Sequence, residues 1–295
     1  MEGHRAGFVN IIGAPNVGKS TLLNNLLGEG LSIITPKAQT TRHRLMGILN
    51  GEGHQAVLSD TPGILDPQYK LHESMLRSVD EALEDADLIL LVTDASRKRR
   101  SFHPSVLQRV RTVQVPVIVL INKIDLSEQK AVEEQVSAWK EELEKADVWP
   151  VSALHAFHIQ ELRNHMIGLL PNNPPYFPKD DLTDKPVRFF VAEIIREKIL
   201  SFYQEEVPYS CEVVVREYEE KEALVRIKAD IMVLRPSQRS ILLGEKGKAI
   251  KKLGIHSRRD IETLVGKKVH LDLQVKVDEN WRDDSRKLRK YGYSG

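Results

Sequence analysis

The sequence is poor in cysteine and has no long hydrophobic run. A single cysteine, Cys211, among 295 residues excludes a disulfide framework and a cysteine-ligated zinc finger. No stretch approaches the roughly 18 consecutive apolar residues of a membrane-spanning helix, and the longest resemble residues 117–121, VIVLI. The first residues lead directly into a strand-like run without a secretory signal. These absences predict a cytoplasmic protein.

Length and charge point to two domains of different character. At about 150 residues per domain, 295 residues suggest two domains, each able to bury its own core. The net charge of +1 conceals an asymmetry, because residues 188–295 hold 23 Lys and Arg against 18 Asp and Glu. Within residues 235–268 the ratio is ten to three. A polyanionic partner would require such a basic patch, although a solvated basic surface is the alternative.

The first 170 residues alternate short apolar runs with longer helical patterns. Continuous apolar strands separated by helices are typical of a parallel sheet covered on both faces. We therefore predict a doubly wound, mostly parallel α/β domain. The predicted strands are residues 8–12, 56–59, 88–92 and 117–121, with helices at 21–27 and about 130–145.

Four prolines among residues 171–178 interrupt this pattern, because proline continues neither a helix nor a central strand. We expect domain 1 at residues 1–172, a linker at 173–187, domain 2 at 188–280 and a charged tail at 281–295. Domain 2 has the predicted order α-β-β-α-α-β, a compact α+β unit. Its predicted elements are a helix at 187–203, strands at 210–218, 223–234 and 268–277, and two short helices around residues 244–247.

A phosphate-binding loop lies between the first predicted strand and the first helix. Its pattern is G-x-x-x-x-G-K-[ST], in which backbone N–H groups and the helix N-terminus surround a phosphate. The lysine would contact the β- and γ-phosphates and the serine hydroxyl would ligate Mg²⁺. The residues are Gly13, Ala14, Pro15, Asn16, Val17, Gly18, Lys19 and Ser20, followed by Thr21.

A second motif, Asp60-Thr61-Pro62-Gly63, follows the predicted strand 56–59. Its carboxylate would hold Mg²⁺ through water, and the N–H of Gly63 would contact the γ-phosphate. Alone, the D-x-x-G pattern indicates no more than a turn. Its position after this strand favours the nucleotide site, with Pro62 and Thr61 beside the phosphates.

The third motif, Asn122-Lys123-Ile124-Asp125, selects the base. Guanine offers a ring N–H beside an exocyclic amine, and one carboxylate accepts both, whereas adenine has an acceptor in place of that ring N–H. Polar mismatches of this kind can discriminate by about 10⁴–10⁵. A backbone N–H near Ser152, Ala153 and Leu154 would contact the guanine carbonyl. We therefore predict GTP or GDP, and not ATP, as the ligand.

Together these motifs resemble those of TRAFAC-class bacterial GTPases, and residues 36–44, PKAQTTRHR, resemble the first switch segment of Era-type GTPases. The resemblance implies that Thr40 or Thr41, with Thr41 preferred, ligates Mg²⁺ beside Ser20 and Asp60 in the GTP state. An exposed polar loop is the alternative for this segment. The candidate catalytic residues are Lys19, Thr41, Gly63 and Asn16.

One position departs from the Ras-like pattern. Ile64 follows Gly63, where Ras-like enzymes carry the glutamine that orients the attacking water. We therefore expect slow intrinsic hydrolysis. Asn16 matches the asparagine that ligates an activating K⁺ ion in related GTPases, so K⁺ stimulation is a hypothesis, with local hydrogen bonding of Asn16 as the alternative.

Residues 244–247 form a G-x-x-G turn between two predicted helices, which is the signature of a KH domain that clamps about four nucleotides. Clustered lysines would contact the sugar-phosphate backbone. Segments 196–200 and 205–210 also resemble the start of the KH domain of Era-type GTPases, and the predicted element order is that of type II. The candidate RNA-binding residues are Gly244, Glu245, Lys246, Gly247, Lys248, Lys251 and Lys252.

The resemblance covers nearly the whole chain. It implies a Mg²⁺-dependent GTPase that binds 16S ribosomal RNA near its 3′ end, acts in assembly of the 30S subunit and rRNA processing, and associates peripherally with the inner membrane. We expect a monomer. The alternatives are an RNA-binding module controlled by GTP occupancy with incidental hydrolysis, and a membrane-associated signalling GTPase.

Overall fold

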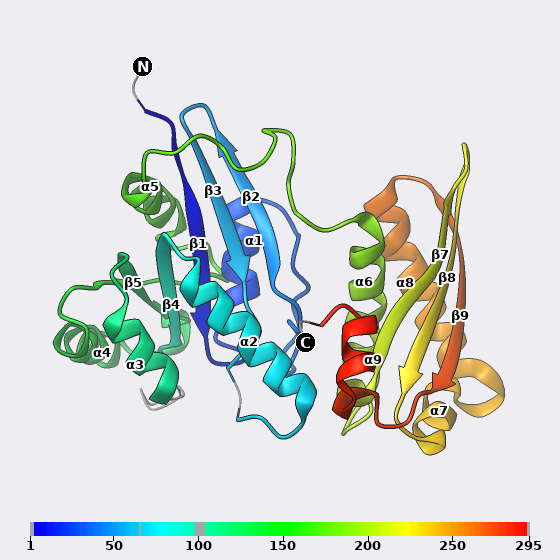
Figure 1. The fold of residues 1–295 in the computed structure, drawn as a ribbon. Coiled ribbons are helices and arrows are strands. Elements are labelled where there is room, and N and C mark those ends of the chain that lie inside the picture. The colour runs from blue at the N-terminus through cyan, green and yellow to red at the C-terminus, as the bar shows by residue number, and fades with distance from the viewer. Residues whose placement is uncertain (1–2, 65, 98–103, 294–295) are drawn as a thin grey trace. The chain divides into compact units, whose positions relative to one another are not determined.

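The computed structural model describes residues 3–64, 66–97 and 104–293, which form two compact units (Figure 1). The first unit holds the chain up to Gln68 and His72–Asp184. The second holds Tyr69–Leu71 and the chain from Lys185 onward. Each unit has its own sheet, and no described helix combines the length and apolarity that a membrane crossing needs.

The first unit is built on a six-stranded sheet in the order β2-β3-β1-β4-β5-β6. All neighbouring strands are parallel except β2 and β3. Every residue of β4 is buried, as expected for a strand covered on both faces. The predicted fold class is confirmed, but the antiparallel edge strand β2 was not predicted. The strands are β1 (Arg5–Gly13), β2 (Leu45–Gly51), β3 (His54–Asp60), β4 (Leu88–Asp94), β5 (Val117–Asn122) and β6 (Asp147–Pro150).

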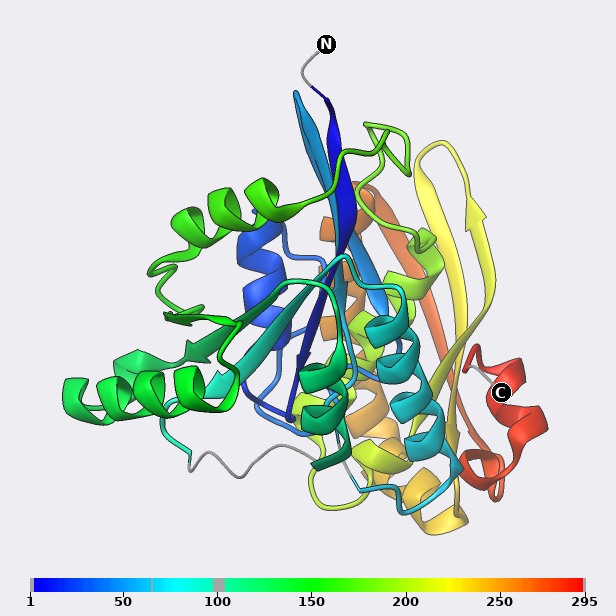
Figure 2. The same ribbon diagram turned by 60° about the vertical axis from the view of Figure 1, so that its left-hand side comes forward.

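Helices cover both faces of this sheet. Figure 2 shows α1 and α5 on one face and α2 and α3 on the other. Apolar residues of α2, α3 and α4 pack with those of β1, β4 and β5 in one core that includes the buried Trp139. The helices are α1 (Lys19–Leu27), α2 (Lys70–Glu84), α3 (Pro104–Thr112), α4 (Gln129–Glu142) and α5 (Ile159–Leu169), with a 3₁₀ turn at Ile124–Leu126.

The proline-rich segment that follows α5 lies against the edge of this sheet (Figure 1). The buried side chain of Gln55 in β3 accepts hydrogen bonds from the backbone N–H groups of Tyr176 and Phe177 and donates to the carbonyl of Phe177. Farther on, the N–H of Ile48 in β2 donates to the carbonyl of Leu182 at 2.9 Å. Residues 171–184, which include most of the expected linker, are therefore fixed to the first unit. They also cover the outer edge of β2, which would otherwise present unpaired backbone groups.

The second unit is a three-stranded sheet, β7-β8-β9, in which β7 and β8 are antiparallel and β8 and β9 parallel. Alternate residues of β8 face a core formed with α6, α7 and α8, which is the period-two pattern of a half-covered strand. We expected two short helices around residues 244–247. This was wrong for α8, the helix that follows the turn, because it has 18 residues. The elements are α6 (Val187–Phe202), β7 (Glu212–Glu220), β8 (Leu224–Val233), α7 (Pro236–Leu243), α8 (Lys248–Val265) and β9 (Lys268–Val277).

The charged tail is anchored to the second unit. It contains a 3₁₀ turn, Trp281–Asp283, and α9 (Ser285–Lys290), which lies on the side of the sheet opposite α6 and α8 (Figure 2). The buried Trp281 donates from Nε1 to the carbonyl of Ser210, and the buried Tyr293 donates to the carboxylate of Glu212. The tail therefore contributes buried aromatic side chains as well as charge.

Candidate functional site

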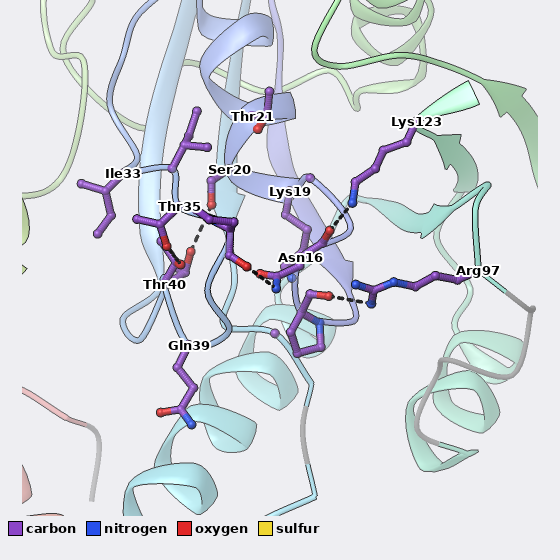
Figure 3. Close-up of a pocket in the computed structure, with 16 residues that line it drawn as sticks. Asn16, Lys19, Ser20, Thr21, Ile33, Thr35, Gln39, Thr40, Arg97 and Lys123 are labelled. Carbon is purple, nitrogen blue, oxygen red and sulfur yellow. Dashed lines mark hydrogen bonds between the residues drawn. The ribbon is translucent and has the colours of Figure 1, made fainter. Parts of the chain in front are cut away.

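The phosphate-binding loop connects β1 to α1 and opens into a cavity of about 480 Å³ that residues 33–41 also line (Figure 3). Two of its residues, Asn16 and Gly18, have positive φ angles of 62° and 100°. A Cβ atom at Gly18 would lie 2.3 Å from Nδ2 of Asn122, so only glycine fits there. A tight loop that leads into a helix N-terminus is the arrangement that an anion site requires.

Lys19 is buried at the start of α1, and its ammonium group donates to the carbonyl oxygens of Gly13 and Ala14 at 3.0 Å each. Burial lowers the pKa of Lys19 to about 8, although the nearby carboxylate of Asp60 acts in the opposite direction. A phosphate group in the loop would supply the counter-charge that this ammonium group lacks.

Binding of GDP is therefore expected to be coupled to proton uptake at alkaline pH. At pH 9 most Lys19 side chains are neutral before binding, and the phosphates favour the charged form, so uptake should approach about one proton. At pH 7 Lys19 is already charged and contributes only about a tenth of a proton. Calorimetry in buffers of different ionisation enthalpy measures this uptake. Lys19→Arg, whose guanidinium is always charged, is the control that should show none at pH 9. Equal proton exchange at pH 7 and pH 9 in the wild type would contradict the prediction.

Three hydroxyl groups converge on one buried carboxylate oxygen, and two of them, those of Ser20 and Thr41, belong to residues that line the cavity. Oδ2 of Asp60 accepts from the hydroxyls of Ser20 at 2.6 Å, Ser32 at 2.8 Å and Thr41 at 3.1 Å. Among the described residues, Oδ1 of Asp60 is buried without a hydrogen-bond partner. Hydroxyl oxygens grouped with a carboxylate that has one unsatisfied oxygen are hard ligands of the kind that Mg²⁺ prefers. The residues present therefore fit the predicted metal.

The structure also distinguishes the two threonines of the switch segment. The hydroxyl of Thr41 lies 3.1 Å from that of Ser20, within the cluster around Asp60. The hydroxyl of Thr40 instead donates to the carbonyl of Lys37 and lies 2.6 Å from that of Thr35, toward which it points in Figure 3. The geometry favours Thr41 as the Mg²⁺ ligand.

Gly63 lies against the phosphate loop, and Asn16 of that loop contacts the switch segment. A Cβ atom at Gly63 would lie 2.8 Å from Cα of Pro15, so the D-x-x-G turn and the phosphate loop approach as closely as glycine allows. The next residue, Ile64, is buried in the core of the first unit. Nδ2 of Asn16 donates to the carbonyl of Pro36 at 2.9 Å, which is the local hydrogen bond weighed against a K⁺ site.

The base-selecting motif follows β5 and is linked to the phosphate loop. The buried Asn122 donates to the carbonyl of Val17 at 2.7 Å and accepts from the N–H of Ala153 at 2.8 Å. Oδ1 of Asp125 accepts from the hydroxyl of Ser152 at 2.6 Å. The three predicted segments thus lie together, with the Asp125 carboxylate partly exposed. Leu154, also predicted, is largely exposed.

Lys123 links the phosphate loop to the end of β4. Its ammonium group donates to the carbonyl of Asn16 at 2.6 Å (Figure 3). It also donates to Oδ2 of Asp94 at 2.8 Å. Burial opposes ionisation of Asp94, but hydrogen bonds from Lys123 and Ser96 outweigh it and hold the pKa of this carboxyl below its usual value. Asp94, at the end of β4, was not predicted as a site residue.

Two adjacent asparagines on α1 were also missed, and they support loops on different sides of the site. The side chain of Asn24 holds the backbone of Ser32 before the switch segment. The side chain of Asn25 donates to the carbonyl of Ala153 at 2.7 Å, beside the base-selecting residues. Asparagine is a poor residue for a helix interior. A pair of them in a short helix is therefore a signal that could have pointed to tertiary hydrogen bonds.

The far end of the switch segment is fixed by Arg44. Its guanidinium pairs with the carboxylate of Asp85, and it also donates to Oδ1 of Asn10 and the hydroxyl of Ser59 at about 3 Å. These partners come from β1, β3 and the end of α2, so the chain enters β2 at a fixed point.

In the second unit, the G-x-x-G turn joins α7 to α8. Gly244 has φ 66° and ψ 179°, and a Cβ atom there would lie 2.6 Å from Cβ of Ala249. Gly247 has φ 77°, but a Cβ atom there would meet open space. The first glycine is thus required by packing and the second by conformation. The exposed residues on this turn and the start of α8 are Glu245, Lys246, Lys248, Lys251 and Lys252.

A groove of about 380 Å³ runs between α8 and β9. Of the predicted RNA-binding lysines only Lys251 lines it, while Lys252 lies over the ring of Phe202 at 5.0 Å and Lys248 pairs with Glu245 at 3.6 Å. The groove residues that were not predicted include Ile255, Arg258, His270 and Leu271. Ile255 and Arg258 follow Lys251 at helical spacing, which is a usable signal, whereas the β9 residues become neighbours only in the fold.

Comparison with protein families finds one family match in each of the two units. Residues 8–123 match the family described as 50S ribosome-binding GTPase, and residues 206–282 match the KH domain family. The chain is 43% identical over 290 residues to GTPase Era of Geotalea uraniireducens, covering 98% of each protein. It is 41% identical over 296 residues to the chloroplastic GTPase ERA1 of Zea mays, covering 99% of this chain and 71% of the relative.

Two solved structures match almost the entire chain. One is Era in complex with MgGDPNP and nucleotides 1506–1542 of 16S ribosomal RNA, with a TM-score of 0.94 and 38% identity over 99% of this chain and all of the other. The second, a variant of Aquifex aeolicus Era bound to GDP·AlF₄⁻, has a TM-score of 0.93 and 38% identity over the same shares.

Proposed function

The chain belongs to the Era family of GTPases, and from this we propose that it couples Mg²⁺-dependent GTP hydrolysis to binding of the 3′ region of 16S ribosomal RNA, in 30S subunit assembly and rRNA processing. The observation that carries the proposal is the match over 99% of this chain to an Era structure that holds both a GTP analogue and that RNA. Peripheral association with the inner membrane and a monomeric state belong to the proposal through family resemblance alone.

In this proposal the residues of the first unit bind and orient GTP. Asp125 accepts the two guanine donors, and Lys19 moves from the carbonyls of Gly13 and Ala14 to the phosphates. Ser20, Thr41 and Asp60 would hold Mg²⁺, which would supply positive charge beside the phosphate oxygens. The N–H of Gly63 would contact the γ-phosphate. Residues 36–44 would be held through Thr41 until the phosphate leaves.

Hydrolysis by the chain alone is expected to be slow, because Ile64 is buried and offers no hydrogen bond to an attacking water. We therefore include K⁺ near Asn16 in the proposal, as a source of positive charge beside the phosphates. For this, the side chain of Asn16 would have to exchange its bond to Pro36 for the ion.

For the RNA, the proposal uses the turn at residues 244–247 and the groove between α8 and β9. Backbone at the two glycines would approach the sugar-phosphate chain, and Lys246, Lys248, Lys251 and Lys252 would supply counter-charge. The mixed polar and apolar lining of the groove, including Ile255, Arg258 and His270, suits stacking and hydrogen bonding of unpaired bases.

The test is GTP turnover by the full chain, with and without RNA of the sequence 1506–1542, in buffers containing K⁺ or Na⁺. We expect RNA to bind and to raise turnover, and K⁺ to exceed Na⁺. Tight RNA binding with unchanged turnover would favour the alternative of a module controlled by GTP occupancy, which rapid-quench kinetics can verify. Absence of RNA binding at moderate salt would overturn the proposal for the second unit, and equal rates in K⁺ and Na⁺ would remove the ion from it.

A further inference from the structure

Ser32 lies just before the switch segment and outside every sequence motif of the nucleotide site. Its side chain is buried, with 7% of its surface exposed. Its hydroxyl donates to Oδ2 of Asp60 at 2.8 Å, alongside the hydroxyls of Ser20 and Thr41. A charge-assisted hydrogen bond in a buried setting is among the stronger contacts in a protein. Ser32 therefore has a means of fixing how the Asp60 carboxylate is turned.

The backbone of Ser32 is held by one side chain of α1. Nδ2 of Asn24 donates to the carbonyl of Ser32 at 2.8 Å, and Oδ1 of Asn24 accepts from the N–H groups of Ser32 and Leu31 at 2.8 and 3.0 Å. The amide thus satisfies both backbone groups of Ser32. Because α1 begins at the phosphate loop, Asn24 ties the position of Ser32 to the helix that carries Lys19 and Ser20.

We propose that Ser32 is a positioning residue for the Mg²⁺ site, because its hydroxyl orients the Asp60 carboxylate in both the GDP and GTP states. Asn24 in turn fixes the backbone of Ser32. The inference rests on the proposed function, since it requires that Asp60 serve Mg²⁺. Outer-shell partners of this kind fix the direction of a metal-binding group.

Three donors reach Oδ2 of Asp60, and they differ in what holds them. Ser20 has a lone pair that must point to the metal. Thr41 belongs to the segment that is released when the γ-phosphate leaves. Ser32 lies outside that segment, and its bonds to Asn24 involve neither phosphate nor metal. Its hold on Asp60 therefore persists when Thr41 has moved away, and its loss should weaken Mg²⁺ binding in the GDP complex as well.

The experiment measures Mg²⁺ affinity of the GDP complex, by calorimetry and by the electron paramagnetic resonance signal of Mn²⁺ used as a substitute. Ser32→Ala and Asn24→Ala are each expected to weaken binding about 10- to 100-fold. Thr41→Ala should do so only in the complex with a non-hydrolysable GTP analogue. Ser78→Ala is the matched control, because it removes a buried serine hydroxyl that bonds only within α2, to the carbonyl of Ser74.

The double variant Asn24→Ala/Ser32→Ala tests whether the two residues act in one chain. If Asn24 acts through Ser32, the double variant should be no weaker than Ser32→Ala alone, whereas additive losses would overturn the role of Asn24. Affinity for Mg²⁺ in Ser32→Ala that equals or exceeds the wild-type value would overturn the role of Ser32. If Ser32→Ala fails to fold, Ser32→Cys keeps the volume with a weaker donor and is judged by the same criteria. Failure of the wild type to bind Mg²⁺ with GDP would instead refute the proposed function.

Discussion

Asp125→Asn is expected to lower the affinity for GTP by about 10⁴-fold and to create affinity for xanthosine triphosphate. The carboxylate accepts two parallel donors from guanine. An asparagine amide offers one acceptor and one donor, so its NH₂ would face a donor of guanine. Xanthine has a carbonyl in place of the exocyclic amine, and the same amide then matches both of its groups.

Competition by GTP, xanthosine triphosphate and ATP against a fluorescent nucleotide measures this exchange. Glu128→Gln is the matched control, because Glu128 is an exposed carboxylate three residues along the chain, outside the site. It should leave GTP affinity within about twofold, since exposed charges at this distance interact weakly. A variant at 125 that loses GTP without gaining xanthosine triphosphate would show that Asp125 does not read the base edge.

Gly247→Asp is expected to weaken RNA binding about 100-fold, with GTP affinity unchanged. A carboxylate about 5 Å from a phosphate is repelled by roughly 3 kcal/mol at an effective dielectric constant of 20. The variant should fold, because Gly247 is left-handed at φ 77° and a Cβ atom there meets no neighbour. Asp and Asn both tolerate this conformation better than most side chains do.

Gly247→Asn is the matched control, since it has nearly the same shape without the charge. Its RNA affinity should lie between those of the wild type and Gly247→Asp, and the gap between the two variants should narrow at high salt. The measurement is titration of RNA 1506–1542 at several salt concentrations. Equal affinities of the Asp and Asn variants would mean that no phosphate approaches Gly247.

The fold and the nucleotide motifs could be predicted because their signals are local in the sequence. The phosphate loop, the D-x-x-G motif and the base-selecting motif each begin at the end of a largely buried strand. The carboxyl ends of parallel strands meet at one edge of the sheet. The G-x-x-G turn was recognisable for a similar reason, since its glycines adjoin the helices that they separate. The resemblance left Thr40 and Thr41 both open, with Thr41 preferred, because only the fold gives neighbouring hydroxyls their directions.

What escaped prediction depends on contacts between distant segments. Ser32 and Asp60 are 28 residues apart, and Lys123 and Asp94 are 29 apart. Gln55 fixes a segment more than 120 residues farther along the chain. The proline-rich segment therefore resembled a free linker, although its backbone groups find partners on the sheet edge. The charged tail likewise gave no sign that Trp281 and Tyr293 would be buried.

Ser32 and Arg44 are fixed points, and the eleven residues between them, 33–43, form a tether that includes most of the switch segment. Fully extended, eleven residues span roughly 36–40 Å, so the middle of the tether can travel roughly 20 Å from either end. A partner that directly contacts the released middle of the tether must therefore lie within about 20 Å of Ser32 and of Arg44. The entropic free-energy cost of closing such a loop rises by only about 0.6 kcal/mol when the length of the loop doubles. Insertions between residues 33 and 43 would therefore lengthen the reach of the released segment in proportion to their size, whereas the cost of closing the loop would rise only slowly.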